Sequence, residues 1–123
     1  MNGDNVLLDT NAVLYILGGK ISIDALPEGI YYISFITELE LLSYPDISKT
    51  EIDTIQKFID GIDIIDINRA IKERTIELRR KYKLRLPDAI VCATALYLES
   101  PLVTNDKELK RVSELKIVTP LFK

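Results

Sequence analysis

Acidic residues recur at the ends of apolar segments in this 123-residue chain. Four segments carry them, and the residues are Asp9, the pair Glu38 and Glu40, Asp88, and Asp106. Carboxylates gathered in one place repel each other unless a cation offsets their charge. Oxygen ligands without His or Cys favour Mg²⁺ or Mn²⁺. These residues predict a divalent cation site, provided that the fold brings the four segments together.

The composition removes several other kinds of active site. The chain has no His, which excludes a Ser–His–Asp triad, an imidazole acid–base pair and His-ligated zinc. The single Cys, Cys92, can form neither an internal disulfide nor a Cys-x-x-Cys site, and we expect it to be a buried helix residue. Carboxylates, or a metal that they hold, are left to carry any catalysis.

The order of elements predicts an α/β fold. We expect strands at residues 6–8, 30–34, 62–67 and 102–104, with an edge strand at 115–118. The expected helices cover residues 11–17, 36–44, 48–60, 70–81 and 87–98, and a short helix follows Asp106. Alternating strands and helices predict right-handed crossovers and a parallel sheet between helical layers. The length of the chain predicts one domain over residues 1–123.

Parallel strands place their carboxyl ends at one edge of the sheet, where open α/β folds bind ligands. Asp9 ends the first strand, and Asp106 lies two residues beyond the fourth. Crossover helices run antiparallel to the strands, so Asp88 at the start of one helix reaches the same edge. Each residue alone could be a helix cap or a partner of a helix dipole. Helical periodicity does not choose between Glu38 and Glu40 as the fourth acid.

Positive charge is concentrated in residues 69–85. Eight of the 16 basic residues lie there with two Glu, a local charge of +6, which leaves −9 for the rest of a chain whose net charge is −3. A basic face on an acidic body can contact a polyanion, although a solvated helix face explains the pattern equally well. The candidate contact residues are Arg79, Arg80, Lys81, Lys83 and Arg85.

Four motifs occur in order along the chain: LLDTN at 7–11, ISFITELELL at 33–42, LPDAIVCATA at 86–95 and VTND at 103–106. They resemble the motifs of PIN-domain proteins, particularly the small bacterial and archaeal VapC-like toxins, over nearly the whole chain. The resemblance implies a three-layer α/β/α fold around a central, mostly parallel sheet of four to five strands. The sequence departs from the family pattern at Leu109, a packing position where many relatives have Phe.

The resemblance further implies a Mg²⁺- or Mn²⁺-dependent ribonuclease. It assigns metal binding and catalysis to Asp9, Glu40, Asp88 and Asp106, and so selects Glu40 over Glu38. Supporting polar positions are Thr10, Asn11, Ser34, Thr104 and Asn105. The expected reaction is hydrolysis by a metal-activated water, which leaves a 5′-phosphate and a 3′-hydroxyl. The absence of His agrees, because metal-independent cleavage through the 2′-hydroxyl usually needs acid–base groups that the chain lacks.

Partners follow from the same resemblance. Proteins of this type form homodimers and, where they are toxins, bind a cognate antitoxin whose tail occupies the acidic groove. The five basic candidates would then hold RNA or an acidic segment of the antitoxin. Residues 1–5 contain no positive targeting region, and no segment approaches the ~18 apolar residues needed to cross a bilayer. We therefore expect a cytoplasmic protein that has no membrane contact.

Two alternatives use the same residues differently. A PIN fold that binds RNA or protein without cutting it would keep the motifs and lack turnover. A phospho-receiver domain of similar length would use Asp66 at the end of the third strand, Thr104 after the fourth, and Lys116 late in the chain. A receiver needs an acidic pair after the first strand, where only Asp9 is present.

Overall fold

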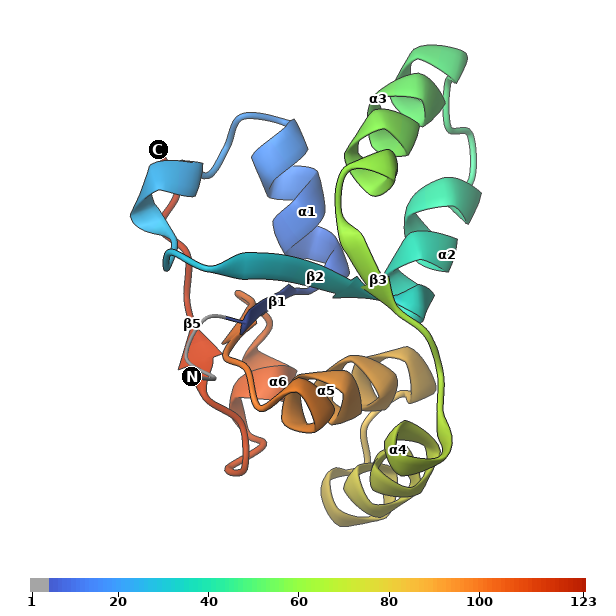
Figure 1. The fold of residues 1–123 in the computed structure, drawn as a ribbon, viewed down its shortest axis with the longest axis vertical. Coiled ribbons are helices and arrows are strands. Elements are labelled where there is room, and N and C mark those ends of the chain that lie inside the picture. Colours follow the sequence, from blue (N-terminus) through green and yellow to red (C-terminus); the bar gives the residue numbers. More distant parts are fainter. Residues whose placement is uncertain (1–4) are drawn as a thin grey trace.

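A parallel sheet lies between two layers of helices (Figure 1). The structure is a computed structural model that describes residues 5–123; residues 1–4, on which the prediction of no targeting region partly rests, lie outside the described part. The strands are β1 (Asn5–Leu8), β2 (Ile30–Ser34), β3 (Asp63–Ile65), β4 (Leu102–Val103) and β5 (Ile117–Val118). They pair in the order β3-β2-β1-β4-β5, and every pairing is parallel. The predicted α/β class is confirmed.

Helices cover both faces of this sheet. One layer holds α1 (Thr10–Leu17), α2 (Phe35–Ser43) and α3 (Lys49–Asp60), and the other holds α4 (Arg69–Tyr82), α5 (Leu86–Leu98) and α6 (Lys107–Lys110) (Figure 1). A short 3₁₀ helix, η2 (Ile23–Ala25), precedes β2 and was not predicted. In the part of the chain that the structure describes, no helix is long and apolar enough to cross a membrane.

Local side-chain contacts fix the helix starts. Ser48 and Glu51 form a reciprocal capping box at α3, as their spacing predicts. Asn68 caps α4 by accepting a hydrogen bond of 2.9 Å from the backbone N–H of Ile71. The strand predicted over residues 62–67 is shorter, because β2 gives way to α2 after Ser34 and leaves residues 66–67 without a partner strand.

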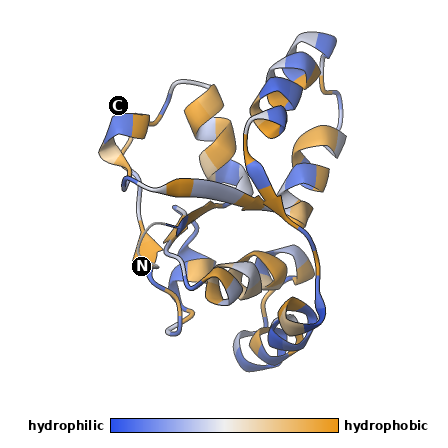
Figure 2. Ribbon diagram, viewed as in Figure 1, coloured by the Kyte–Doolittle hydropathy of each residue, from blue (hydrophilic) through white to orange (hydrophobic). Residues whose placement is uncertain are grey.

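The core is divided by the sheet. Leu7 of β1 packs into a cluster with α4 and α5, whereas Val6 and Leu8 pack with α1, α2 and α3. All three side chains are buried, which explains the apolar run without alternation at this strand. Figure 2 shows the hydrophobic sides of the outer helices turned toward the sheet and their hydrophilic sides turned outward. Two packed layers therefore fix the carboxyl ends of β1 and β4.

Candidate functional site

The strand order reverses at the centre of the sheet. From β1 the chain crosses to β2 and β3 on one side, and β4 and β5 lie on the other. Leu8 pairs with Val103, so Asp9 and Thr104 emerge side by side at the carboxyl edge. The backbone N–H of Asp9 donates to the Val103 carbonyl at 3.2 Å, which extends the pairing by one residue. Ligands of open α/β sheets bind at such a switch point.

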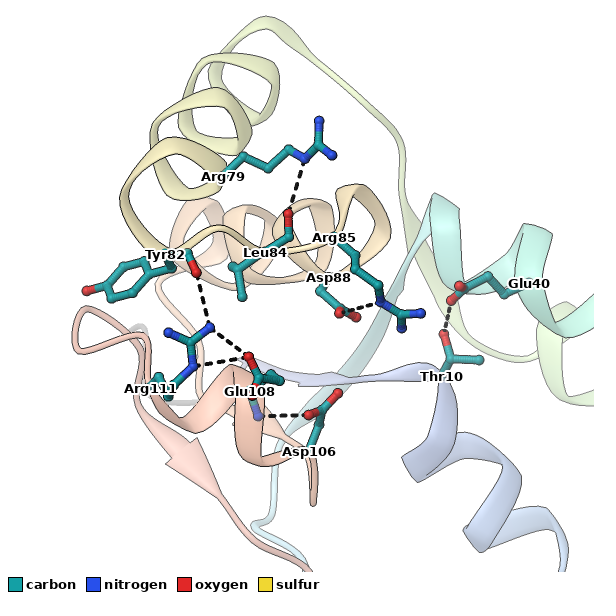
Figure 3. A network of polar contacts seen from close by, with 10 residues as sticks. All are labelled: Thr10, Glu40, Arg79, Tyr82, Leu84, Arg85, Asp88, Asp106, Glu108 and Arg111. Carbon is teal, nitrogen blue, oxygen red and sulfur yellow. Dashed lines mark hydrogen bonds and ion pairs between the residues drawn. The ribbon is translucent and has the colours of Figure 1, made fainter.

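A pocket of about 280 Å³ opens at this edge. Its lining contains the four acidic residues selected from the sequence, which are Asp9, Glu40, Asp88 and Asp106. The six other lining residues are Thr10, Asn11, Leu14, Tyr44, Arg85 and Leu109. In Figure 3, Glu40 is turned toward Thr10, Asp88 toward Arg85, and Asp106 toward the start of α6. Glu38 does not line the pocket, so the fold distinguishes two glutamates that periodicity alone could not separate.

Asp9 is the most enclosed of the four acids and is 6 % exposed. Its Oδ1 accepts a hydrogen bond of 2.7 Å from the backbone N–H of Ala12 and so caps α1. Burial raises the pKa of Asp9 above its ordinary value, and the negative charges of Asp106 and Asp88 raise it further. Hydrogen bonds from Thr104 and Ala12 oppose that rise in pKa without cancelling it. Burial first, and the neighbouring negative charges second, therefore disfavour the ionised form of Asp9.

Two of the other acids have local backbone or ionic partners. Asp106 caps α6 by accepting a hydrogen bond of 2.8 Å from the Glu108 N–H, and its own N–H donates to the buried Thr104 hydroxyl at 3.0 Å. Asp88 lies in the first turn of α5, where its Oδ2 is 3.3 Å from Nε of Arg85. Thr104 thus touches two of the acids, because Asp9 also accepts a hydrogen bond from it.

Glu40 reaches the pocket from α2. The Thr10 hydroxyl donates to its Oε1 at 2.6 Å and lies 3.1 Å from the buried Thr37 hydroxyl. This chain of polar contacts links α1 to α2 and turns Glu40 inward. Thr37 and Tyr44 were not identified from the sequence. Their spacing from Glu40, three residues before and four after, places all three on one face of α2 and would have been a usable signal.

The other polar candidates differ in what they contact. Asn11 lines the pocket and is exposed. Ser34 is fully buried and caps α2 through the Ile36 N–H at 3.2 Å. Asn105 donates to the Pro120 carbonyl at 3.1 Å, and within the described residues its buried Oδ1 has no hydrogen-bond partner. Ser34 and Asn105 do not line the pocket, so both contact the framework around it.

The five basic candidates lie in different parts of the surface. Arg85 lines the acidic pocket, whereas Arg79, Arg80 and Lys83 line a second hollow at the turn between α4 and α5. Lys81 belongs to neither, because its Nζ pairs with Glu114 at 3.1 Å. Of the five predicted contact residues, only Arg85 reaches the acids.

Chemically, the pocket offers oxygen donors and no His or Cys. Among residues 5–123, no three acidic, His or Cys side chains lie close enough together to hold a metal ion. The contacts above give the reason, since each of the four carboxylates is turned toward a helix N-terminus, a hydroxyl or Arg85. Mutual repulsion at Asp9 and an all-oxygen donor set fit a hard divalent cation once these side chains rotate.

Two other chemistries do not fit. Cys92 is 0 % exposed, and burial together with the charges of Asp88, Asp106 and Asp9 raises the pKa of its thiol to about 12, which leaves it unreactive. A phospho-receiver fold has the strand order 2-1-3-4-5. Here β3 lies at the sheet edge, and Asp66 beyond it is exposed and outside the pocket. The receiver alternative is therefore wrong.

The molecule is a doubly wound, all-parallel α/β protein that has an acidic pocket at its topological switch point. It belongs to the PIN domain family, whose profile matches residues 6–115.

Known relatives cover nearly the whole chain. Ribonuclease VapC2 of Methanocaldococcus jannaschii is 25% identical over 142 aligned positions, which span 96% of this chain and 95% of that protein. A toxin–antitoxin complex from Klebsiella pneumoniae contains a chain that is 30% identical, with a TM-score of 0.78 and coverage of 94% of this chain and 98% of that one. VapBC2 of Rickettsia felis, solved with a DNA fragment from its promoter, has a TM-score of 0.80 at 20% identity over 95% of this chain and 99% of that one.

Proposed function

We propose that this protein is a VapC-like toxin of a toxin–antitoxin pair and that it hydrolyses RNA phosphodiester bonds with Mg²⁺ or Mn²⁺. The observation that carries the proposal is that four carboxylates from four separate segments line one pocket. The family supports it, as do relatives named as a ribonuclease and as a toxin–antitoxin complex.

Asp9 and Asp88 are our candidates for direct metal ligands, and Glu40 and Asp106 would complete the acidic surroundings of the metal. When bound, the cation supplies a water of lowered pKa and offsets negative charge on the phosphate oxygens. Thr10 holds the Glu40 carboxylate, and Thr104 holds both Asp9 and the backbone of Asp106. These contacts hold the acids at the rim of the pocket, from which their side chains rotate to bind a cation.

The proton of the attacking water passes in this proposal to a carboxylate outside the direct ligand pair, Glu40 or Asp106. The phosphodiester bond breaks on the 3′-oxygen side, so the products carry a 5′-phosphate and a 3′-hydroxyl. A 2′,3′-cyclic phosphate among the products would contradict this mechanism, because it requires attack by the neighbouring 2′-hydroxyl.

The proposed partners are RNA, a second copy of the chain and a cognate antitoxin, in the cytoplasm. The hollow formed by Arg79, Arg80 and Lys83 supports contact with a polyanion, whether an RNA strand or an acidic antitoxin segment. Charge reversal at Arg79 and Arg80 should weaken RNA or antitoxin binding, and unchanged affinity for both would remove this part of the proposal.

The deciding experiment compares wild type, Asp9→Asn and Glu38→Gln on end-labelled structured RNAs with Mg²⁺, with Mn²⁺ and with EDTA. We expect cutting by wild type and by Glu38→Gln, which changes an acid outside the pocket, and none by Asp9→Asn. Asn caps a helix as well as Asp does, so the Asp9→Asn variant should remain folded. Cutting that survives both EDTA and Asp9→Asn would contradict the proposal.

A non-catalytic PIN module is the second candidate. It is favoured by one observation, the absence among residues 5–123 of three acidic side chains that already converge as metal ligands. Wild type that binds Mn²⁺, remains folded and turns over no RNA would support this candidate.

A further inference from the structure

The backbone of Arg85 is held in place by hydrogen bonding, whereas its side chain extends into solvent. It directly precedes α5, and its carbonyl accepts a hydrogen bond of 3.0 Å from the Ala89 N–H. The neighbouring Leu84 is buried in the core, and its carbonyl accepts from Nε of Arg79 at 3.2 Å. The Arg85 side chain is 81 % exposed and makes no capping hydrogen bond. Its guanidinium can therefore move while its attachment point stays in place.

Among residues 5–123, the polar partner of this guanidinium is Asp88. Nε lies 3.3 Å from Asp88 Oδ2, and among the described residues no hydrogen bond engages its two terminal amino groups (Figure 3). The Asp88 side chain is 19 % exposed, but the Arg85 side chain is open to solvent, which screens the pair and limits its contribution to stability to about 0–1 kcal/mol. Exchanging the partner of Arg85 therefore costs little.

Charge at the pocket explains why another partner matters. Arg85 is the basic residue among the described side chains that line the pocket, against four carboxylates. One divalent cation offsets two of the four negative charges, so a phosphate still approaches a net negative surface. A planar guanidinium at the rim can donate two parallel hydrogen bonds to the non-bridging oxygens of a phosphate.

We propose that Arg85 changes partners: it pairs with Asp88 in the free protein and with an RNA phosphate once a divalent cation has taken Asp88. This inference rests on the proposed function. Arg85 is thus both a competitor of the metal and a substrate-binding residue. Its removal should strengthen metal binding and weaken cleavage, whereas simple damage to the pocket would weaken both.

The test uses the full chain with Arg85→Gln, Arg85→Lys and the control Arg69→Gln. Arg69 is a close match, because its Nε pairs with Glu73 at 3.4 Å and its side chain is 91 % exposed, but it lies at the far end of α4 outside the pocket. Calorimetric titration with Mn²⁺ alone, without RNA, should show about two- to fivefold tighter binding for Arg85→Gln, the size expected when an exposed ion pair is removed. Arg69→Gln should bind Mn²⁺ like wild type.

Cleavage of an RNA that wild type cuts supplies the second measurement. Arg85→Gln should lower kcat/KM by about ten- to a hundredfold, the cost of one charged hydrogen-bonding partner. The slope of log(kcat/KM) against log[salt] should fall in magnitude by about 0.7, which corresponds to one phosphate contact on a single strand. Arg85→Lys should recover part of the rate, because Lys keeps the charge without the planar fork.

Only opposite changes in metal affinity and cleavage support the inference. Mn²⁺ affinity that is unchanged or weaker in Arg85→Gln overturns it, and so does a cleavage rate equal to that of Arg69→Gln. In both cases the nuclease proposal stands, because wild type still cuts and Asp9→Asn does not. If wild type neither binds Mn²⁺ nor cuts RNA, the proposed function fails and this inference fails with it.

Discussion

Two carboxylates of this molecule, Asp9 and Glu114, have opposite surroundings. Glu114 accepts hydrogen bonds from the Tyr82 hydroxyl and from Lys81, and these contacts, with that of Tyr82 the largest, hold its pKa at about 2. Asp9 is buried beside two other acids, which with its burial raise its pKa. The fold supplies Glu114 with its own donors and cation, but surrounds Asp9 with like charge.

The difference extends to the two regions around these residues. Near Glu114, Arg111 donates to the Tyr82 carbonyl at 3.1 Å and to Glu108 at 2.7 Å, which ties α4 to α6 (Figure 3). At the pocket, the positively charged side chain among the described residues is Arg85, which is exposed. A carboxylate satisfied within the protein stabilises the fold, whereas carboxylates left with like charges are suited to an external cation.

The largest expected effect separates the two regions by activity. Asp88→Asn should lower cleavage by about a thousandfold, because a metal ion contributes several kcal/mol to the stabilisation of the transition state. Glu114→Gln should cleave at the wild-type rate. End-labelled RNA assays at saturating Mg²⁺ measure both, and equal losses in the two variants would show that the distinction has no bearing on catalysis.

Metal binding should stabilise only the protein with an intact pocket. Mg²⁺ at about 100 times its Kd should stabilise wild type and Glu114→Gln by about 2.7 kcal/mol. Asp9→Asn should show little of this gain, because the variant lacks one proposed ligand. Thermal melts with and without Mg²⁺ measure the shift in Tm. A full shift in Asp9→Asn would place the metal elsewhere.

Without metal, Asp9→Asn should be more stable than wild type at neutral pH. The pKa of Asp9 in the folded state is above its unfolded value of 3.8. The free energy of unfolding of wild type therefore falls as pH rises from 3.8 through the folded-state pKa. The advantage of Asp9→Asn should therefore disappear as pH falls toward 3.8. Urea melts across this range, in EDTA, check the sign, and a variant less stable than wild type at pH 7 would contradict it.

Glu114→Gln should have the smallest effect and the opposite sign. Its pKa is lowered from 4.5 to about 2, so its contribution to stability is present above pH 4.5 and is lost as pH falls through about 2. The site is largely open to solvent, which limits the expected loss at pH 7 to about 1 kcal/mol or less. Urea melts of Glu114→Gln at pH 7 measure it, and a gain in stability would reverse the comparison.

Much of the fold could be predicted because its signals are local. The capping box at Ser48, the cap at Asn68 and the apolar run at β1 depend on residues within a few positions of one another. The length of β3 could not be predicted, because it depends on where β2 ends in a neighbouring strand. The η2 helix, which has no side-chain cap, gave no comparable signal.

That four acids line one pocket could be predicted from the sequence, but the contacts of these side chains could not. The parallel direction of the strands and the opposite direction of the crossover helices were enough to predict that Asp9, Asp88 and Asp106 lie at one edge. The pairing of Lys81 with Glu114 joins residues far apart in the sequence, and no periodic pattern encodes it. For the same reason the sequence did not reveal that Thr10 holds Glu40 across two helices.

The adjacency of β1 and β4 sets the time at which this pocket can exist. Asp9 is made long before its neighbours Thr104 and Asp106, which follow β4. A nascent chain that lacks β4 has no partner on that side of β1 and no complete set of acids. The proposed active site is therefore complete only once Asp106 has been made, and a growing chain that stops short of this residue should not cut RNA.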